Sequence, residues 1–384
     1  MLTKAQSLHD QLAGWRRDFH MHPELGFAEH RTAARVAEIL SGLGCRVRTG
    51  VGRTGLVAEL GAGAPIVALR ADLDALPILE ANAVPYASQN PGVMHACGHD
   101  AHTAIGLGVA ALLSNESFEG TVRFLFQPSE EASDEEGLSG APRMIADGAL
   151  ENVDYVLALH VDPSTRAGDI ALLPGVASAG VDTFYATLFG VGGHGAMPHK
   201  VIDPIYLSGH VILALHGIVS RRLPPLDPAV VSIGSIHGGH TDNVIPDRVE
   251  LTGTLRYLEP SVQQSIHAEV ERALSLARAL GGDYQLRIEL GYPPLVNDPA
   301  VVDDLRRVAG DLLGDEHVFV RRLEMGAEDF SFMTELAPGA MFSLGCWGEG
   351  EERRLHSPHF DLDEDCLPVG AAVLAETALR YLRK

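Results

Sequence analysis

Residues 66–77 read IVALRADLDALP, a short apolar run followed at once by aspartates and a proline. A strand with no polar face is typical of a parallel sheet that is covered on both sides. Similar runs lie at Val122–Phe126 and Tyr155–Val161, and helix-like stretches rich in Ala, Leu and Gly lie at Thr32–Leu43 and Thr103–Leu113. This alternation predicts an α/β domain with a mostly parallel sheet.

From about residue 182 the pattern changes to β-α-β-β-α-β, the order of a ferredoxin-like α+β domain. The segments in this order are Thr183–Phe189, Asp203–Arg222, Val230–His237, Arg248–Leu255, Ser261–Leu280 and Tyr284–Leu290. After Pro294 the first pattern resumes, with a helix near 300–313, a strand at 341–344 and a final helix at 369–382. We therefore expect a discontinuous α/β domain, residues 1–181 and 292–384, that carries an inserted domain, residues 182–291.

Composition narrows the class of protein. A chain of 384 residues with 46% hydrophobic and 21% charged residues predicts an ordinary globular protein of about two domains. The net charge of −22, without a run of Lys and Arg, argues against nucleic-acid binding. No apolar run has the length of a signal peptide or a membrane span. The four cysteines show no paired spacing, which favours reduced thiols in a cytoplasmic protein.

Residues that bind metals or move protons follow each strand of the first half. Asp72 and Asp74 follow the first run, QPSEE at 127–131 follows the second, and His160 ends the third. A fourth such segment, MHACGHDAH at 94–102, precedes a predicted helix. Ligands of open α/β sheets bind beyond the carboxyl ends of the strands. The four segments together therefore predict a metal site at one edge of the sheet.

Cys97 and His99 flank Gly98, so both side chains can face one ion if the loop curls. Thiolate, imidazole and carboxylate donors together suit zinc, or a neighbouring cation such as manganese, cobalt or nickel. The alternative is a buried cysteine beside a helix-capping Asp100. His95 and His102 remain available as further ligands.

The carboxylates of this edge divide into different roles. Asp74 is placed to accept a hydrogen bond from a ligating histidine, whereas Asp72 stays unassigned. Glu130 and Glu131 are adjacent, and in a loop that leaves a strand one can bind the metal while the other takes the proton of an activated water. The acidic residues 134–136 favour a solvated loop over a second metal site.

Further candidates lie downstream. His356 stands in the segment LHSPHF at 355–360, and His194 stands among glycines in GGHGAMPH at 192–199, where the backbone can approach a ligand or simply turn. Asn243 and Arg256 are candidates for holding a substrate carboxylate, with a surface ion pair as the alternative for Arg256. The acids of GAEDF at 326–330 either line the site or start a helix.

Together these segments resemble the metal-dependent amidohydrolases that include hippurate hydrolases, indole-acetyl-amino-acid hydrolases and N-acyl-L-amino-acid amidohydrolases, relatives of glutamate carboxypeptidase and the aminoacylases. The similarity extends from RDFHMHPEL at 17–25 to HSP at 356–358, and HACGHD at 95–100 with QPSEE is its most specific part. It implies a metallopeptidase-type catalytic domain with an inserted lid or dimerisation domain. It also implies two divalent cations per subunit and a homo-oligomer formed through the lid.

Carried over residue by residue, the resemblance assigns roles. Glu130 matches the general base, and His194 matches the lid histidine that stabilises the oxyanion in its own or a partner's site. Asn243 and Arg256 match lid positions that contact substrate. The stretch 132–138 is longer and more acidic than is usual in the family, which bears on the rim of the substrate site. The implied metal ligands are Cys97, His99, Glu131, His160 and His356.

The expected function is hydrolysis of the amide bond of N-acyl amino acids, such as acetyl or benzoyl conjugates. One alternative is a dipeptidase or aminopeptidase that uses the same metals. A second is a metal-bound binding protein without turnover, against which the presence of two adjacent glutamates argues. A third is a cysteine hydrolase built on Cys97. The acyl group, the preferred amino acid, the physiological metal and the oligomeric state stay open.

Overall fold

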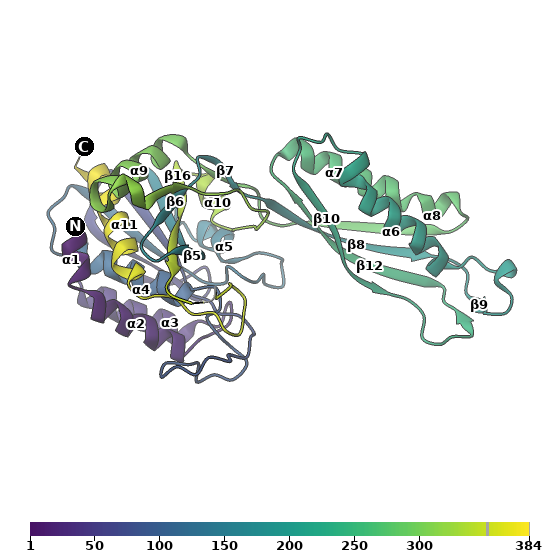
Figure 1. The fold of residues 1–384 in the computed structure, drawn as a ribbon, viewed down its shortest axis with the longest axis horizontal. Helices are drawn as coiled ribbons and strands as arrows, with labels where there is room; N and C mark the ends of the chain where they lie inside the picture. The colour runs from purple at the N-terminus through teal and green to yellow at the C-terminus, as the bar shows by residue number, and fades with distance from the viewer. Residues whose placement is uncertain (351–352, 384) are drawn as a thin grey trace. The chain divides into compact units, whose positions relative to one another are not determined.

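The fold is described from a computed structural model that covers residues 1–350 and 353–383. The chain forms two compact units (Figure 1). The first, here called the catalytic unit, comprises Met1–Gly175, Val296–Arg322 and Asp329–Lys384. The second, the inserted unit, comprises Val176–Leu295 and Leu323–Glu328. The short second segment of the inserted unit was not expected; within that unit, the Ala179 backbone N–H donates to the Gly326 carbonyl at 2.8 Å.

The catalytic unit is built on an eight-stranded sheet in the order β1-β2-β4-β3-β5-β16-β6-β15. Its centre, β4-β3-β5-β16, is parallel, and β2 and β6 pair antiparallel with the two sides of this centre. The strands are β1 (Arg46–Val51), β2 (Gly55–Ala62), β3 (Ile66–Asp72), β4 (Gly120–Gln127), β5 (Tyr155–Arg166), β6 (Ile170–Leu172), β15 (Val318–Val320) and β16 (Gly339–Trp347). The expected α/β class with a mostly parallel sheet is confirmed.

The sequence missed β1 for a physical reason. β1 lies at the edge of the sheet and is exposed at most positions, so its residues do not form the continuous apolar run of a central strand. By contrast, β3 and β4 are buried at nearly every position. The continuous apolar runs therefore identified the central strands that hold the site, but not the exposed strand at the edge of the sheet.

A fully buried helix, α4, lies next to the site. All 15 of its residues are buried, and it packs on α2, α3 and α11 as well as on β3, β4 and β5. The helices and 3-10 turns of this unit are α1 (Leu2–Gln6), α2 (His9–Met21), α3 (His30–Gly42), α4 (His99–Leu113), α5 (Gly140–Ala146), α9 (Pro299–Leu313), η2 (Asp315–His317), α10 (Ser331–Thr334) and α11 (Cys366–Leu382). Polar residues at the start of α4 must therefore find partners inside the protein.

The inserted unit is a four-stranded antiparallel sheet in the order β10-β12-β8-β13, with α6 and α7 along one face (Figure 1). Alternate residues of β8 are buried, since one face of the sheet is covered by the helices. The main elements are β8 (Gly180–Phe189), α6 (Pro204–Arg221), β10 (Ala229–His237), β12 (Arg248–Tyr257), α7 (Pro260–Leu274), α8 (Leu276–Ala279) and β13 (Asp283–Leu290). This is the β-α-β-β-α-β order of the sequence prediction.

One expected helix of this unit is wrong in detail. The predicted helix at 261–280 is divided into α7 and α8 at Ser275, whose hydroxyl donates to the Arg272 carbonyl at 2.6 Å. Such a local bond offers the backbone an alternative to continuous helix. The smaller elements are β7 (Gly175–Ser178) paired with β14 (Leu295–Asn297), β9 (Gly193–His194) paired with β11 (Val244–Ile245), and η1 (Pro198–Lys200).

None of the helices within residues 1–350 and 353–383 combines the length and apolarity needed to cross a membrane.

Candidate metal centre

The expected ligands converge at the carboxyl edge of the parallel strands. One expectation was wrong in detail: β5 does not end at His160 but continues to Arg166, because β16 keeps pairing with it beyond Ser343↔His160. On the other side, the pairing of β5 with β3 stops at Arg70↔Ala158. His160 therefore lies just beyond the last β3 pair, at the edge where the other segments end.

Three overlapping groups of donor atoms form there, and within each group all donors lie within 4.8 Å of one another. One group contains Cys97, His99 and His160, and a second contains Cys97, Glu131 and His356. The third adds Glu130 to His99 and Glu131. Cys97 Sγ is 3.4 Å from His160 Nε2, and His356 Nε2 is 3.0 Å from Glu131 Oε1. The five expected ligands are thus brought together, with Cys97 common to the first two groups.

A glycine makes the Cys97–His99 arrangement possible. Gly98 has φ +89° and precedes the first residue of α4, a left-handed conformation that L side chains rarely adopt. A Cβ at this position would also collide with the Val161 side chain. The curl that the sequence required for two ligands on one ion therefore depends on Gly98.

Asp74 connects two of the expected ligands. Its Oδ1 lies 3.1 Å from His99 Nδ1, and its Oδ2 accepts from the Glu131 backbone N–H at 3.0 Å. His99 Nδ1 also lies 3.0 Å from the Asp74 carbonyl oxygen. With Nδ1 donating to Asp74, His99 turns Nε2 toward Cys97 and the glutamates.

His102 and Asp72 form a buried pair behind the donor groups. His102 Nδ1 contacts Asp72 Oδ1 at 2.7 Å, and its Nε2 accepts from the Val161 backbone N–H at 3.0 Å. Both ring nitrogens are engaged, so His102 has no lone pair left for a cation. Burial opposes ionisation of Asp72, but His99, Arg70 and His102 outweigh it and hold the pKa of Asp72 well below its ordinary value. Asp72, which the sequence left unassigned, therefore acts as a buried anion.

His95 stands apart from the donor groups. Its ring is buried, and neither nitrogen has a hydrogen-bond partner within the described part of the chain. Burial lowers the pKa of His95 to about 4, which leaves the ring neutral. It belongs to none of the donor groups found among the described residues. Of the two histidines that the sequence held open as extra ligands, His95 lies outside the donor groups found among the described residues, and His102 groups with Asp72 and His99 but has both ring nitrogens engaged.

The donor set fits divalent cations. His99 Nε2 is buried and has no hydrogen-bond partner among residues 1–350 and 353–383, although it faces the cluster. Burial, reinforced by His102, lowers the pKa of His160 well below its ordinary value, so this ring is neutral and can donate a lone pair. Burial raises the pKa of the Cys97 thiol well above its ordinary value, and a cation is the partner that stabilises a buried thiolate.

Glu130 and Glu131 leave the end of β4 through a strained turn. Ser129, which precedes them, is buried and has φ +44°. Its hydroxyl donates to the Ala132 carbonyl at 2.9 Å, closing a loop that contains both glutamates. Glu130 is 8% exposed, so it is a nearly buried carboxylate beside the donor groups.

The acidic stretch that follows is held by arginines. Asp134 is buried at its carboxylate and pairs with Arg53 at 2.8 Å and Arg143 at 2.6 Å. It also accepts the backbone N–H of Glu136 and Leu138. None of residues 134–136 belongs to a donor group found in the described part of the chain. The stretch is an ordered loop on the surface, in which Asp134 is paired with two arginines.

The candidates from the inserted unit lie on two of its elements. His194 in β9 pairs with Val244 in β11, and the Gly195 N–H donates to the Asn243 carbonyl at 2.8 Å. Side chains at Gly192 and Gly195 would press on the backbone of residues 243–247. These glycines therefore allow two backbone segments of the inserted unit to approach each other.

Arg256 lies in β12 and is half buried. Its Nε donates to Thr254 Oγ1 at 3.2 Å, and no carboxylate pairs with it among the residues that the structure describes. Burial lowers the pKa of Arg256. The surface ion pair that the sequence offered as the alternative is therefore absent in that part of the chain.

Two buried networks were not foreseen. Asp100, expected at most to cap a helix, accepts the Ala101 N–H at 2.9 Å in the first turn of α4 and also pairs with Arg16 at 2.8 Å and His20 at 2.7 Å. Asp329 accepts hydrogen bonds from Arg70 at 3.0 Å and Gln127 at 2.8 Å, and also from Ser139 Oγ at 2.6 Å and the Ala141 N–H at 3.0 Å. Sequence separations of 80 to 259 residues leave no local signal for such pairs.

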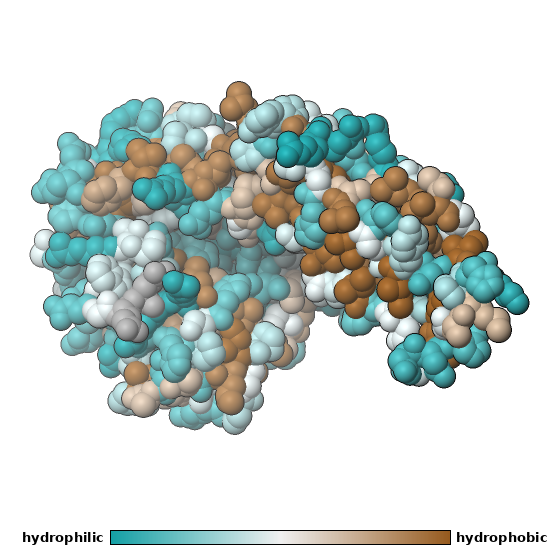
Figure 2. All heavy atoms as spheres, turned by 45° about the vertical axis from the view of Figure 1, so that its right-hand side comes forward, coloured by the Kyte–Doolittle hydropathy of each residue, from teal (hydrophilic) through white to brown (hydrophobic). Residues whose placement is uncertain are grey.

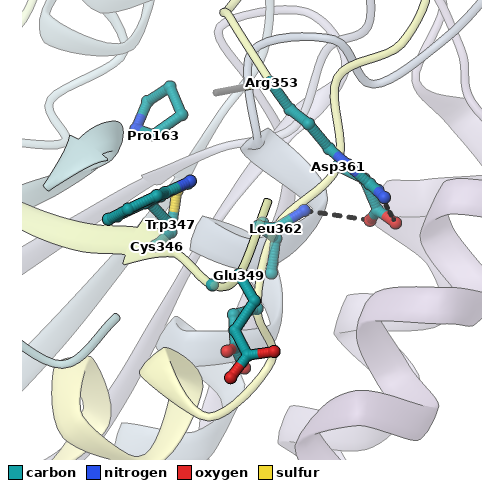
Figure 3. A pocket seen from close by; sticks show the side chains of 9 residues that line it. Pro163, Cys346, Trp347, Glu349, Arg353, Asp361 and Leu362 are labelled. Carbon is teal, nitrogen blue, oxygen red and sulfur yellow. Dashed lines mark hydrogen bonds and ion pairs between the residues drawn. The ribbon is translucent and has the colours of Figure 1, made fainter. Parts of the chain in front are cut away.

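A separate hollow of about 250 Å³ lies on the catalytic unit (Figure 3). Trp347, Glu349 and Arg353 line it, and Arg353 pairs with Asp361 at 2.8 Å (Figure 3). None of the five expected metal ligands lines this hollow.

Comparison with known proteins decides the family. The profile described as peptidase family M20/M25/M40 matches residues 68–380. The chain belongs to this family. It is 39% identical to thermostable carboxypeptidase 2 of Saccharolobus solfataricus, over 99% of this chain and 97% of that protein. It is 37% identical to N-acetyl-L-cysteine deacetylase of Bacillus subtilis, over 98% of this chain and 89% of that protein.

A solved structure from the M20 family shows the same fold. It is a Bacillus subtilis protein described as a dinuclear metal binding peptidase, with a TM-score of 0.84, 33% identity, and coverage of 98% of this chain and 99% of that one. As an M20/M25/M40 member, the chain is a hydrolase of the metal-dependent amidohydrolase class, which confirms the family and the enzyme class that the sequence predicted.

Proposed function

We propose that the chain hydrolyses the amide bond of N-acyl amino acids with two divalent cations. The observation that supports this most is the pair of donor groups that share Cys97, with the Glu130 carboxylate beside them. Two cations in adjacent positions with a nearby base are one known arrangement for metal-assisted amide hydrolysis. The similarity to N-acetyl-L-cysteine deacetylase supports an acylated amino acid as substrate.

The cations would be held by Cys97, His99, Glu131, His160 and His356. The mixture of sulfur, nitrogen and oxygen donors favours zinc or manganese, with cobalt or nickel as further candidates. When bound, the cations supply Lewis acidity, which activates water near neutral pH and polarises the scissile carbonyl. Asp74 orients His99 and the backbone of Glu131 for this task.

Glu130 is the proposed general base. Glu131 already contacts His356 and shares a donor group with Cys97, whereas Glu130 shares no donor group with Cys97 among the described residues. Glu130 takes the proton of the attacking water and returns it to the leaving amine. The developing negative charge lies on the former carbonyl oxygen, and it requires a hydrogen-bond donor.

His194 is the proposed donor to that oxyanion, and its hydrogen bonding supports the role. His194 Nδ1 accepts from the Ala196 N–H at 3.1 Å, so a neutral ring carries its proton on the exposed Nε2. An oxyanion donor of this kind lowers the activation free energy by about 3 kcal/mol. Arg256, half buried and without a carboxylate partner in the described chain, and Asn243 would bind the substrate carboxylate.

The main rival is cleavage of short peptides, which the similarity to a carboxypeptidase supports. A cysteine hydrolase is a weaker rival, because burial raises the pKa of Cys97 and so disfavours the thiolate that such an enzyme needs as its nucleophile. A binding protein without turnover would have no need of Glu130.

One experiment separates these functions. The enzyme is stripped with a chelator, single metals are restored, and acetyl and benzoyl amino acids are compared with free dipeptides. Turnover of the acylated amino acids that vanishes on chelation and returns with Zn²⁺ or Mn²⁺ supports the proposal. Turnover of dipeptides alone favours the peptidase, and activity that resists chelation but is lost on alkylation favours the cysteine hydrolase.

We further propose a homo-oligomer formed through the inserted unit. Its helix α6 carries exposed apolar side chains, including Ile205, Tyr206 and Leu213, and β10 is an unpaired edge of the sheet in the described chain. Apolar side chains also gather on the surface of this unit in Figure 2. Such a face, next to a free strand edge, favours a second copy of the chain. Because all four thiols are free and buried, the cytoplasm remains the proposed compartment.

A further inference from the structure

Glu29 is a fully buried carboxylate to which no role has been assigned so far. Its Oε1 accepts from the Ser129 backbone N–H at 2.8 Å and from the Phe27 N–H at 3.0 Å. Its Oε2 accepts from the Thr54 hydroxyl. All three hydrogen bonds are donated to the carboxylate, so it functions as an acceptor only.

Ser129, the target of Glu29, is fixed at each of its polar atoms. Glu29 holds its N–H, the Gly140 N–H donates to its carbonyl at 2.8 Å, and its hydroxyl reaches the Ala132 carbonyl. The last bond closes the loop that contains Glu130 and its neighbour. Ser129 thus fixes the direction in which the chain leaves β4, and its positive φ makes this turn costly without support.

The segment around Glu29 is shaped to reach this turn. A Cβ on Gly26 would collide with Ser129 Oγ, so glycine is needed where the two segments touch. The Glu24 carbonyl accepts from the Ala75 N–H at 2.8 Å, next to Asp74. Residues 24–29 therefore contact both loops that carry the carboxylates of the candidate metal centre.

We propose that Glu29 is a positioning residue that holds Ser129 and thereby aims the Glu130 carboxylate. This inference rests on the proposed role of Glu130 as general base. Glu29 contacts neither substrate nor cation, and it acts through the backbone of Ser129. Displacing a base by about 1 Å costs on the order of 100-fold in rate, so a small shift of this turn has a measurable effect.

The chain offers matched variants. Glu29→Ala removes the acceptor of two backbone N–H groups, and Glu29→Asp withdraws the carboxylate by one methylene. Glu29→Gln keeps Oε1 for Ser129 and Phe27 and offers its amide to the Thr54 hydroxyl. Glu24→Ala is the control, because the Glu24 side chain also accepts two backbone N–H groups, those of Arg31 and Thr32, but does not contact Ser129.

The test measures steady-state kinetics of the Mn²⁺-loaded enzymes on acetyl and benzoyl amino acids, and hydrogen exchange of peptides covering residues 127–132. We expect Glu29→Ala and Glu29→Asp to lower kcat roughly 10- to 100-fold with KM changed less than about threefold. We expect faster exchange at Ser129, and Glu29→Gln to restore both. Glu24→Ala should leave kcat and this exchange at wild-type values. If Glu29→Ala does not fold, Glu29→Asp carries the test.

The inference is overturned if Glu24→Ala lowers kcat as much as the Glu29 variants, or if exchange at residues 127–132 is the same in all variants. It is also overturned if Glu29→Gln is as impaired as Glu29→Ala. A wild-type enzyme without activity on any N-acyl amino acid would refute the proposed function instead. In that case the exchange at Ser129 alone decides whether Glu29 holds the turn.

Discussion

Replacing Asp74 by asparagine tests how the centre is held together. The side chain keeps its shape but loses one oxygen acceptor. In the wild type, Asp74 serves His99 with Oδ1 and the Glu131 N–H with Oδ2. In Asp74→Asn the amide group must face one of these two donors, so one hydrogen bond is replaced by two opposed N–H groups.

The magnitude follows from the contact that is lost. His99 Nδ1 also has the Asp74 carbonyl at 3.0 Å, so the remaining side-chain oxygen is expected to stay with Glu131. A hydrogen bond to a charged group contributes about 1.5–3 kcal/mol. Since about 1.4 kcal/mol corresponds to a factor of ten, metal affinity should fall roughly 10- to 100-fold. Asp74→Ala should lose more, because it leaves the Glu131 N–H buried without an acceptor.

The assay is calorimetric titration of Mn²⁺ or Zn²⁺ into the chelator-treated protein. Asp134→Asn is the matched control, since Asp134 is also a carboxylate of the same unit that accepts two backbone N–H groups, but it contacts Arg53 and Arg143 and not the centre. Affinity of Asp74→Asn within about twofold of the wild type, or an equal loss in the control, would refute the reasoning.

Three further outcomes are expected. Glu130→Gln should lower turnover by roughly 10²- to 10⁴-fold with unchanged metal content by elemental analysis; loss of metal would show that the two adjacent glutamates exchange roles. Leu213→Glu, at a side chain that is 74% exposed on α6, should reduce the molar mass in light scattering to that of one chain. Leu226, which is 92% exposed and lies outside α6, provides the control: Leu226→Glu should leave the molar mass unchanged. The same molar mass for both variants would contradict the proposed interface. In the metal-free protein, Glu29→Gln should stabilise the fold more at pH 8 than at pH 5. Burial, assisted by the charge of Asp74, raises the pKa of Glu29 from 4.5 to about 7, so the folded wild type loses up to roughly 3 kcal/mol as the pH rises through 7. Thermal melts of the variant and the wild type at both pH values measure the effect. A stability difference between the two proteins that is the same at pH 5 and pH 8 would disprove it.

The sequence predicted the centre of the fold better than its edges. Continuous apolar runs identified β3, β4 and β5, because strands buried on both faces have no polar positions. The same criterion could not find β1, whose exposed residues resemble a loop. The internal break of the second helix in the inserted unit depends on one hydroxyl at Ser275, which hydrophobic periodicity does not register.

For the candidate site, the sequence predicted which side chains meet but not what supports them. Cys97, His99 and Glu131 could be grouped because each lies at a strand end or helix start, and such ends share one edge of the sheet. The buried contacts that support the site join distant parts of the sequence. Glu29 and Ser129, for example, are 100 residues apart in the chain. Residue types alone do not indicate such pairings, because the sequence does not show whether a glutamate is buried or exposed.

The most direct measurement of the central claim is anomalous diffraction from crystals grown with Mn²⁺ or Zn²⁺, recorded at the absorption edge of the metal. We predict two peaks per chain, both within about 2.5 Å of Cys97 Sγ, and further ligands from His99, Glu131, His160 and His356. A single peak, or peaks at other residues, would contradict a pair of cations that share this cysteine.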